Sequence, residues 1–248
     1  MDPQLPIDNF TLAFSERNMT SRFQVFATAR RPESMQDLFA RGIATLTFEV
    51  TDADVICTIR DEIAAKTGGT LDILVNNAFV AYPVAITDFE MDRVREIFEV
   101  HLFAPMVMVK EFAQLLIAAG DVRIVHIGSV SGIMPIPFSA VYNTSKLRCI
   151  THLNIFQIMS GGVQSKIARS GSLPDDSLFK GMEDLYQAKR LNISQDAYAR
   201  IVVAESVKAA PRAWVWVGRN AFLDYLMSKK FGISEFSARL ANGKVKID

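Results

Sequence analysis

Short apolar segments of strand type alternate along this chain with longer amphipathic segments of helix type, and this alternation constrains the fold more than any other feature. Leu71 to Val75 is almost wholly apolar, and the preceding segment from Ala53 to Lys66 carries Val55, Ile59 and Ile63 at helical spacing. Strands that are apolar on both faces are typical of a parallel sheet covered by helices on both sides. We therefore predict an α/β protein built on a doubly wound parallel sheet.

The same pattern places the other elements. Strands are predicted at Phe23–Ala27, Thr45–Val50, Leu71–Val75, Arg123–Ile127, Leu153–Ile158 and Ala213–Val217. Helices are predicted at Pro32–Ala40, Ala53–Lys66, Phe89–Leu102, Met106–Ala119 and from Ser139 onward. With 248 residues and no repeat or linker, a single domain over residues 1–248 is expected. The polar stretch from about 165 to 200 is predicted to be an insertion that covers a substrate.

Charge and composition argue against several classes of protein. The chain has 27 Lys and Arg residues and 27 Asp and Glu residues, so no net charge attracts nucleic acid or an anionic membrane. No cysteine and histidine cluster has the spacing of metal ligands. The N-terminus lacks the pattern of a signal peptide, and no apolar run reaches the ~20 residues of a transmembrane segment. We therefore expect a cytoplasmic protein that binds neither nucleic acid nor metal.

Tyr142 and Lys146 are four residues apart in a segment predicted to be helical, so their side chains share one face of that helix. Tyrosine has an ordinary pKa near ~10 and is a poor acid or base at neutral pH. A nearby ammonium lowers that pKa and lets the pair exchange a proton with a substrate oxygen. The spacing is also common on solvated helices, so a purely structural role stays open.

A loop of small residues precedes this pair. The predicted strand that ends at Ile127 runs into Gly128 and Ser129, and Ser129 lies thirteen residues before Tyr142. Ligands of open parallel sheets bind at the carboxyl ends of the strands. At that position the Ser129 hydroxyl either polarises the same substrate oxygen as Tyr142 or only forms a turn.

The predicted strand Leu71–Val75 runs directly into Asn76, Asn77 and Ala78. Asparagine side chains at the carboxyl end of a strand can tie neighbouring strands together and leave room for a ribose. The alternative is a simple turn in which the side chain bonds its own backbone.

These three elements, in this order and spacing, resemble the short-chain dehydrogenase/reductase family from about Phe23 to Gly218. Within the family the chain is most similar to fungal members that resemble acyl-dihydroxyacetone-phosphate reductases and hydroxysteroid dehydrogenases. The residues that carry this closer likeness are Phe26–Arg30, Gly68 and Gly69 before Leu71, Val141–Lys146 and Leu178–Lys180. The resemblance implies a Rossmann-like fold. It also implies that Ser129 orients the substrate oxygen, Tyr142 is the general acid/base, and Lys146 lowers the tyrosine pKa and binds a ribose.

The resemblance also implies a nicotinamide cofactor. Family members end the second sheet strand with an acid that binds NAD or a base that binds the 2′-phosphate of NADP. Arg30 follows the corresponding strand, with Arg31 beside it, so NADP is expected. The remaining cofactor contacts implied by the family are Glu49 at the adenine, Asn76 and Ala78 at the ribose, and Val163 and Ser165 at the carboxamide.

The chain departs from the family pattern at four places. The family opens with an apolar strand and a Thr-Gly-x-x-x-Gly-x-Gly loop, whereas Asn9 and Thr11 take glycine positions here and the usual first strand has no counterpart. The helix after Lys146 is short. Phe79 replaces a glycine and is expected to crowd the nicotinamide. His101 stands where the family often has an asparagine that lines a proton-relay water.

Two functions from different classes fit these residues. The first is an NADP-dependent oxidoreductase that interconverts a hydrophobic ketone and a secondary alcohol in lipid or secondary metabolism. The second is a non-redox pseudoenzyme or binding protein, which the altered glycine loop favours. Apolar late residues suit a hydrophobic substrate or an ordinary core: Phe179, Met182, Phe222, Leu226 and Phe231. The family likeness leaves a homodimer or a homotetramer open, and a place at the surface of the endoplasmic reticulum or of lipid droplets.

Overall fold

The structure is a computed structural model that describes residues 23–152, 156–163, 173–182, 184, 193–209, 214–218 and 221, without the side chains of 147–152 and 156. Its strands are β1 (Phe26–Ala29), β2 (Ala44–Thr47), β3 (Ile73–Asn76), β4 (Arg123–Ser129), β5 (Phe156–Ser160) and β6 (Trp214–Val217). Its α-helices are α2 (Gln36–Ala40), α3 (Ala53–Thr67), α4 (Met91–Phe98), α5 (Ala104–Ala119), α6 (Ala140–His152) and α8 (Gln195–Ser206). Each strand overlaps one of the six predicted segments.

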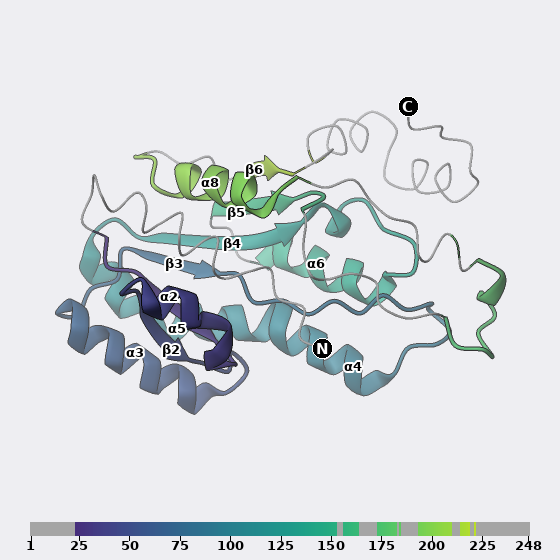
Figure 1. The fold of residues 1–248 in the computed structure, drawn as a ribbon, viewed down its shortest axis with the longest axis horizontal. Coiled ribbons are helices and arrows are strands. Elements are labelled where there is room, and N and C mark those ends of the chain that lie inside the picture. Colours follow the sequence, from purple (N-terminus) through teal and green to yellow (C-terminus); the bar gives the residue numbers. More distant parts are fainter. Residues whose placement is uncertain are drawn as a thin grey trace.

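The described strands form two parallel sheets, one with the order β1-β2 and one with the order β3-β4-β5-β6 (Figure 1). The predicted α/β class and the parallel pairing of β3, β4 and β5 are confirmed. Within the described residues the sheet is divided between β1 and β3, where a continuous Rossmann sheet would carry another strand. Residues 1–22, which include the altered glycine loop, lie outside the described residues.

Local signals set the ends of α3. The Asp52 carboxylate accepts hydrogen bonds from the backbone N–H groups of Asp54 and Val55, at 3.0 and 3.1 Å. Gly68 follows the helix with a φ of 70°, a left-handed conformation that glycine adopts at little cost. The helix therefore begins and ends where the capping residues allow.

The segment predicted as two helices, Phe89–Leu102 and Met106–Ala119, is one continuous helix from Met91 to Ala119. Its middle is a π-helical turn, η2 (Glu99–Phe103), after which Pro105 stands in the first turn of α5. The sequence analysis predicted a break between Leu102 and Met106. The wider π turn carries the chain past the proline without ending the helix. His101 lies inside this turn.

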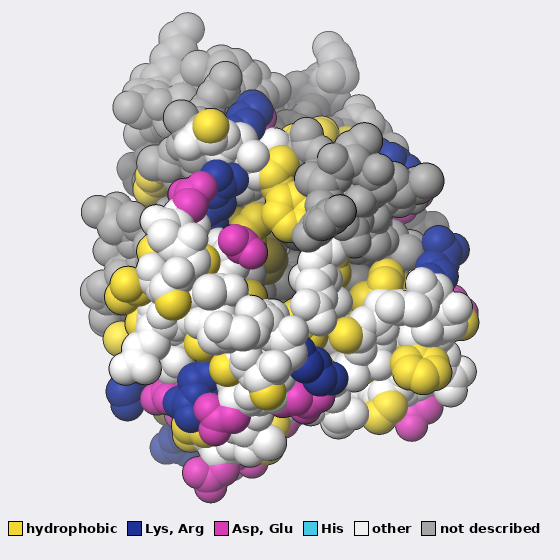
Figure 2. All heavy atoms as spheres, turned by 90° about the vertical axis from the view of Figure 1, so that its left-hand side faces the viewer, with side chains coloured by type: hydrophobic (Ala, Val, Ile, Leu, Met, Phe, Trp, Pro, Cys, Tyr) yellow, Lys and Arg dark blue, Asp and Glu magenta, His cyan; other side chains and the backbone are white. Residues whose placement is uncertain are grey.

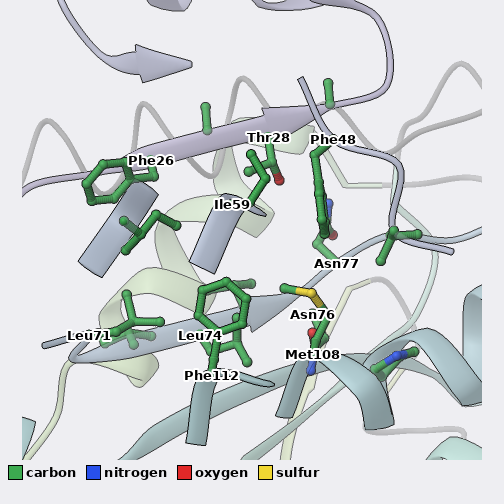
Figure 3. A pocket seen from close by; sticks show the side chains of 18 of the residues that line it. Phe26, Thr28, Phe48, Ile59, Leu71, Leu74, Asn76, Asn77, Met108 and Phe112 are labelled. Atoms are coloured by element: carbon green, nitrogen blue, oxygen red, sulfur yellow. The ribbon is translucent and has the colours of Figure 1, made fainter. Parts of the chain in front are cut away.

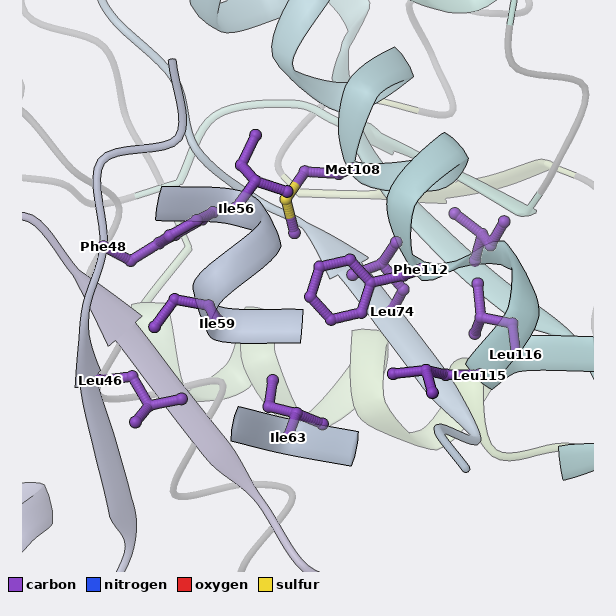
Figure 4. Packing of buried hydrophobic residues seen from close by; sticks show 11 residues of the cluster. Leu46, Phe48, Ile56, Ile59, Ile63, Leu74, Met108, Phe112, Leu115 and Leu116 are labelled. Carbon is purple, nitrogen blue, oxygen red and sulfur yellow. The ribbon is translucent and has the colours of Figure 1, made fainter. Parts of the chain in front are cut away.

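One face of α5 packs against α3 and the first strands of both sheets. Figure 4 shows Phe112 and Met108 of α5 meeting Ile59 and Ile56 of α3 beside Leu74 of β3. By length and composition alone, Met91–Ala119 could also cross a membrane. This is weak evidence, because a core helix of a soluble protein passes the same test, and α5 has that packing here.

A second core lies on the other face of β3–β6. Tyr198 and Val202 of α8 pack there against Val125 and Ile127 of β4. α8 begins inside the last part of the predicted insertion, whose earlier residues are only partly described. The single domain and the substrate-covering role of the insertion therefore stay predictions.

Charges on the surface are mixed in sign. On the face shown in Figure 2, acidic and basic side chains lie interspersed around hydrophobic ones rather than gathered by sign. Several form short-range ion pairs, such as Lys66 with Glu62 and Arg95 with Asp92. Exposed pairs of this kind contribute little to stability.

Candidate active site

Lys146 lies buried at the centre of the candidate site, with 3% of its surface exposed. Its Nζ donates to the carbonyl oxygen of Ile127 at 3.4 Å and lies 5.8 Å from the centre of the Tyr142 ring. Both side chains come from α6, as the four-residue spacing predicts, and the lysine reaches across to β4. α6 ends at His152, so the short helix predicted after Lys146 is confirmed.

Ser129 is the last residue of β4, at the carboxyl end where the sequence predicts a ligand-binding loop. Its Oγ accepts from the N–H group of Ser131 at 3.2 Å and shares a hydrogen bond with Ser131 Oγ at 2.8 Å. The short helix η3 (Val130–Gly132) that follows packs against α6. Ser129 and Tyr142 thus stand on elements in contact, and the convergence of their two hydroxyls on one substrate atom stays a prediction.

His101 joins three segments of the site through its ring. Its Nε2 accepts from the N–H group of Val80 at 2.9 Å, so the proton of the neutral ring sits on Nδ1. Nδ1 then donates to Ser145 Oγ at 2.7 Å, and that hydroxyl donates to the carbonyl oxygen of Tyr142 at 2.8 Å. Sequence reasoning expected a residue that lines a relay water. The structure instead engages both ring nitrogens with protein groups, because the π turn directs the ring toward α6.

Two buried histidines flank the lysine. Burial first, and then the charge of Lys146, lowers the pKa of His126 to about 3. Burial followed by the charges of Lys146 and His126 lowers the pKa of His101 well below its ordinary value. Both rings are therefore neutral at physiological pH, which keeps the positive charge of the site on Lys146.

Phe79 follows Asn77 and Ala78 and is buried in the core with Val125 and Tyr198. The Lys146 Nζ lies 5.6 Å from the centre of its ring. An ammonium at that distance from an aromatic face is attracted by the ring electrons. The ring therefore packs against the lysine, and the crowding of a nicotinamide stays a prediction.

Four of the predicted cofactor residues line one cavity of about 260 Å³ between the two sheets: Arg30, Glu49, Asn76 and Ala78. Arg30 Nη1 lies 3.8 Å from Glu49 Oε2, and both side chains are about a third exposed, at 34% and 40%. Glu49 also accepts from the backbone N–H group and the hydroxyl of Thr51. Among the described residues, Ser129, Tyr142 and Lys146 do not line this cavity.

The amides at the end of β3 have unmet hydrogen-bonding capacity. Asn76 is 9% exposed, and its Nδ2 has no partner, as is also true of the neighbouring Asn77 Oδ1. Buried polar atoms without partners are costly, so such atoms often face a ligand or water. A nucleotide sugar offers the hydroxyl groups that these amides lack.

The predicted carboxamide loop is only partly described. Val163 forms an isolated parallel bridge with Ile193 and packs against the core under β4. Ser165 lies outside the described residues. No cofactor contact of either residue follows from the geometry.

Ser131 and Ser145 were missed as site residues by the sequence reasoning. Both are buried, at 1% and 0% exposure, and each holds a neighbour in place: Ser131 holds Ser129, and Ser145 links His101 to Tyr142. The position of Ser145 three residues after Tyr142 was a usable signal, since a hydroxyl there reaches back to the helix carbonyl. The hydrogen bond between Ser145 and His101 spans 44 residues of the sequence, so no local pattern could predict it.

Comparisons with known proteins agree with this geometry. The family model described as short chain dehydrogenase matches residues 9–153. The short-chain dehydrogenase virD of Hypocrea virens is 32% identical over 243 residues, which cover 89% of this chain and 84% of that protein. The NADPH-dependent 1-acyldihydroxyacetone phosphate reductase of Schizosaccharomyces pombe is 31% identical over 176 residues, 63% of this chain and 59% of that protein.

Solved structures share the fold at low sequence identity. A short-chain dehydrogenase from Streptomyces avermitilis matches 96% of this chain and 94% of its own with a TM-score of 0.73 at 19% identity. A short chain dehydrogenase from Burkholderia cenocepacia in complex with NADP matches 96% and 93% with a TM-score of 0.71 at 16% identity. Together with the family model and the fungal relatives, the fold and the site identify this chain as a member of the short-chain dehydrogenase/reductase family of oxidoreductases.

Proposed function

We propose that this protein is an NADP-dependent oxidoreductase that interconverts a hydrophobic ketone and a secondary alcohol. The observation that carries the proposal is the buried Lys146 ammonium beside the Tyr142 ring. In general, a buried positive charge beside a tyrosine favours its phenolate form and so assists proton exchange with a substrate oxygen.

In the proposed reaction Tyr142 donates its phenolic proton to the carbonyl oxygen of the ketone. A bound nicotinamide would supply the hydride for the carbonyl carbon. Ser129, held by Ser131, donates a hydrogen bond that polarises the same oxygen. His101 and Ser145 keep the backbone of α6 fixed at Tyr142, so the proton is delivered from a set position.

The proposed preference for NADP rests on the position of Arg30 directly after β1, where a guanidinium can form a charge-assisted bidentate contact with a 2′-phosphate. Its Nη1 lies 3.8 Å from Glu49 Oε2 in the same cavity. The amide nitrogen of Asn76, which lacks a hydrogen-bond partner and lines the same cavity (Figure 3), could donate to a ribose hydroxyl. The NADPH dependence named for the Schizosaccharomyces pombe relative supports the same choice.

A hydrophobic substrate is supported by an aromatic cluster beside the start of α6. Phe138 and Phe179 form an edge-to-face pair with ring centres 5.9 Å apart, together with Leu173 and Ala85. Phe138 has a φ of 55°, a left-handed conformation that bulky residues adopt only where the surroundings impose it. The segment that carries Phe138 therefore places apolar side chains close to α6, the helix that carries Tyr142.

The test is calorimetric titration of the full chain with NADPH and with NADH, followed by reduction of a panel of ketones of increasing apolar size. We expect tighter binding of NADPH and faster reduction of the larger apolar ketones. Failure to bind either nucleotide would overturn the proposal.

The second candidate from the sequence is a non-redox binding protein on the same fold. In that case the cavity between the sheets takes a ligand, but no hydride transfer follows. Nucleotide binding without turnover of any ketone, unchanged in Tyr142→Phe, would favour this candidate over the enzyme.

A further inference from the structure

A buried pair of hydroxyl groups lies beside the candidate site and takes no part in the proposed proton transfer. Tyr198 of α8 and Ser160 at the end of β5 share a hydrogen bond through their hydroxyl oxygens, across 38 residues of the sequence. Tyr198 is 1% exposed and Ser160 is 9% exposed. The pair connects α8, which lies over β5 and β6 (Figure 1), to the carboxyl end of the sheet.

Ser160 is the neighbour of Ser129 in the sheet. The two residues are partners in the parallel register of β4 and β5, so they stand ~5 Å apart at the same end of the sheet and project to the same face. Tyr198 belongs to the same core cluster as Phe79, and Tyr142 packs against that cluster. The hydroxyl pair therefore lies next to the residues that would act on a substrate oxygen.

The segment that begins at Ser160 is attached to α8 at both of its ends. At its first residue the attachment is the hydroxyl of Tyr198, which stands in the first turn of the helix. Further along, the carbonyl oxygen of Gly162 accepts from the N–H group of Ile193 at 3.1 Å, and Val163 forms a parallel bridge with Ile193. Ile193 directly precedes the residue that caps α8. The start of this helix thus determines where residues 160–163 lie.

The chemistry of the pair points to geometry rather than to stability. Burial raises the pKa of Tyr198 above its ordinary value, so its phenol stays protonated at neutral pH. Two buried hydroxyls give up their hydration to form one hydrogen bond, and an apolar pair of similar shape is about as stable. What the hydrogen bond adds is direction, because it holds the two oxygens within a narrow range of distances and angles.

We propose that Tyr198 is a positioning residue, which acts through Ser160 to set the place of residues 160–163 beside Ser129. This role rests on the proposed function, because it concerns hydride transfer. The family resemblance expects Val163 at the carboxamide of the cofactor. Tyr198 would therefore set where a bound nicotinamide is received, and so how well its hydride is aligned with the ketone. The phosphate end of the nucleotide is bound elsewhere, so nucleotide affinity should depend little on Tyr198.

Three variants separate stability from position. Tyr198→Phe and Ser160→Ala each break the hydrogen bond while one hydroxyl stays buried, and the double variant removes both hydroxyls. Urea unfolding should give lower midpoints for the single variants and a midpoint near the wild-type value for the double variant. The matched control is Ser206→Ala, which removes a buried hydroxyl at the other end of α8, where it donates to the carbonyl oxygen of Val202.

Turnover distinguishes a positioning role from a structural one. With a ketone that the wild type reduces, all three variants should lower kcat by about tenfold. The Kd for NADPH, measured by calorimetry, should change by less than about threefold. NADPH deuterated at the transferred hydrogen should give a larger isotope effect on kcat than in the wild type, because hydride transfer then limits the rate more strongly. Ser206→Ala should match the wild type in all of these measurements.

Hydrogen exchange adds a measurement that needs no nucleotide. The amides of Gly161 and Ile193 should exchange faster in the double variant than in Ser206→Ala, because the segment between them and α8 is held less firmly. A wild-type kcat in the double variant, or unchanged exchange at both amides, would overturn the positioning role alone. A wild type that neither binds NADPH nor reduces any ketone would overturn the proposed function, and the positioning role with it.

Discussion

The two sides of the molecule differ in how the residues of the candidate site are held. On the side of β3–β6, His101, Ser145 and Lys146 each have protein partners, and Ser131 holds Ser129. Beside β1, the cavity is bordered by two strand edges that have no neighbour among the described strands, and the Asn76 amide nitrogen at its border lacks a partner. The candidate proton-transfer residues are thus held by contacts within the chain, whereas the residues expected to bind a nucleotide line the cavity.

This difference indicates which part of the site is preorganised. The groups that would act on a substrate oxygen are held by neighbours on α6, β4 and the π turn. The groups that would bind a nucleotide lie where the sheet is divided. Variants on the first side should therefore change turnover or stability, and variants on the second side should change nucleotide binding.

The largest effect is expected from Tyr142→Phe, which keeps the ring but removes the proton that the carbonyl oxygen needs. We expect ketone reduction to fall by about 10²–10⁴-fold. Affinity for NADPH, measured by calorimetry, should change little, because the ring and Lys146 remain. A variant with nearly full turnover would show that Tyr142 is not the acid.

The next effect is expected from His101→Ala, because it leaves the Val80 N–H group and the Ser145 hydroxyl without their partner. The free energy of unfolding should fall by about 3 kcal/mol, measured by urea denaturation. Turnover should fall as well, with little change in KM, since Tyr142 loses its fixed position. The side chain of an asparagine at this position can accept from Val80 and donate to Ser145. His101→Asn should therefore restore most of the stability and most of the turnover. If asparagine restored stability but not turnover, the positioning role would be excluded.

A smaller effect concerns the pH dependence of stability through His126. Its folded pKa of about 3 lies below the ordinary value of 6.5, so the unfolded state binds a proton that the folded state refuses. The contribution of His126 to the free energy of unfolding is therefore fully present above pH 6.5 and is lost as the pH falls toward 3. Between pH 6.5 and 4.5, the wild type should lose about 2 kcal/mol more than His126→Leu. If the wild type and His126→Leu lost the same free energy of unfolding between these two pH values, this role of His126 would be ruled out.

The smallest effect is expected from Arg30→Asp on the nucleotide side. The substitution removes a guanidinium that pairs with a 2′-phosphate and adds repulsion, so NADPH affinity should fall by about tenfold more than NADH affinity. Arg41→Asp makes the same charge change at an exposed residue outside the cavity and serves as the control. Equal losses for both nucleotides in Arg30→Asp would show that Arg30 does not read the phosphate.

Much of the local structure could be predicted because its causes are local. The apolar runs that became β3 and β4, the capping of α3 by Asp52, and the shared face of Tyr142 and Lys146 all follow from residues within a few positions of one another. The break predicted near Pro105 was wrong, since a π turn accommodates the proline. A sequence pattern does not distinguish a helix that ends from one that widens.

By itself, the sequence determined the α/β class and the parallel packing of three neighbouring strands, and it supplied the candidate residues for proton transfer. Only the tertiary structure decided that His101 binds Val80 and Ser145 and that Phe79 packs against Lys146. The physical reason is the distance along the chain over which each effect acts. Periodicity and capping act within one element, whereas these contacts join segments 21 to 67 residues apart, and only the packing of whole elements brings such segments together.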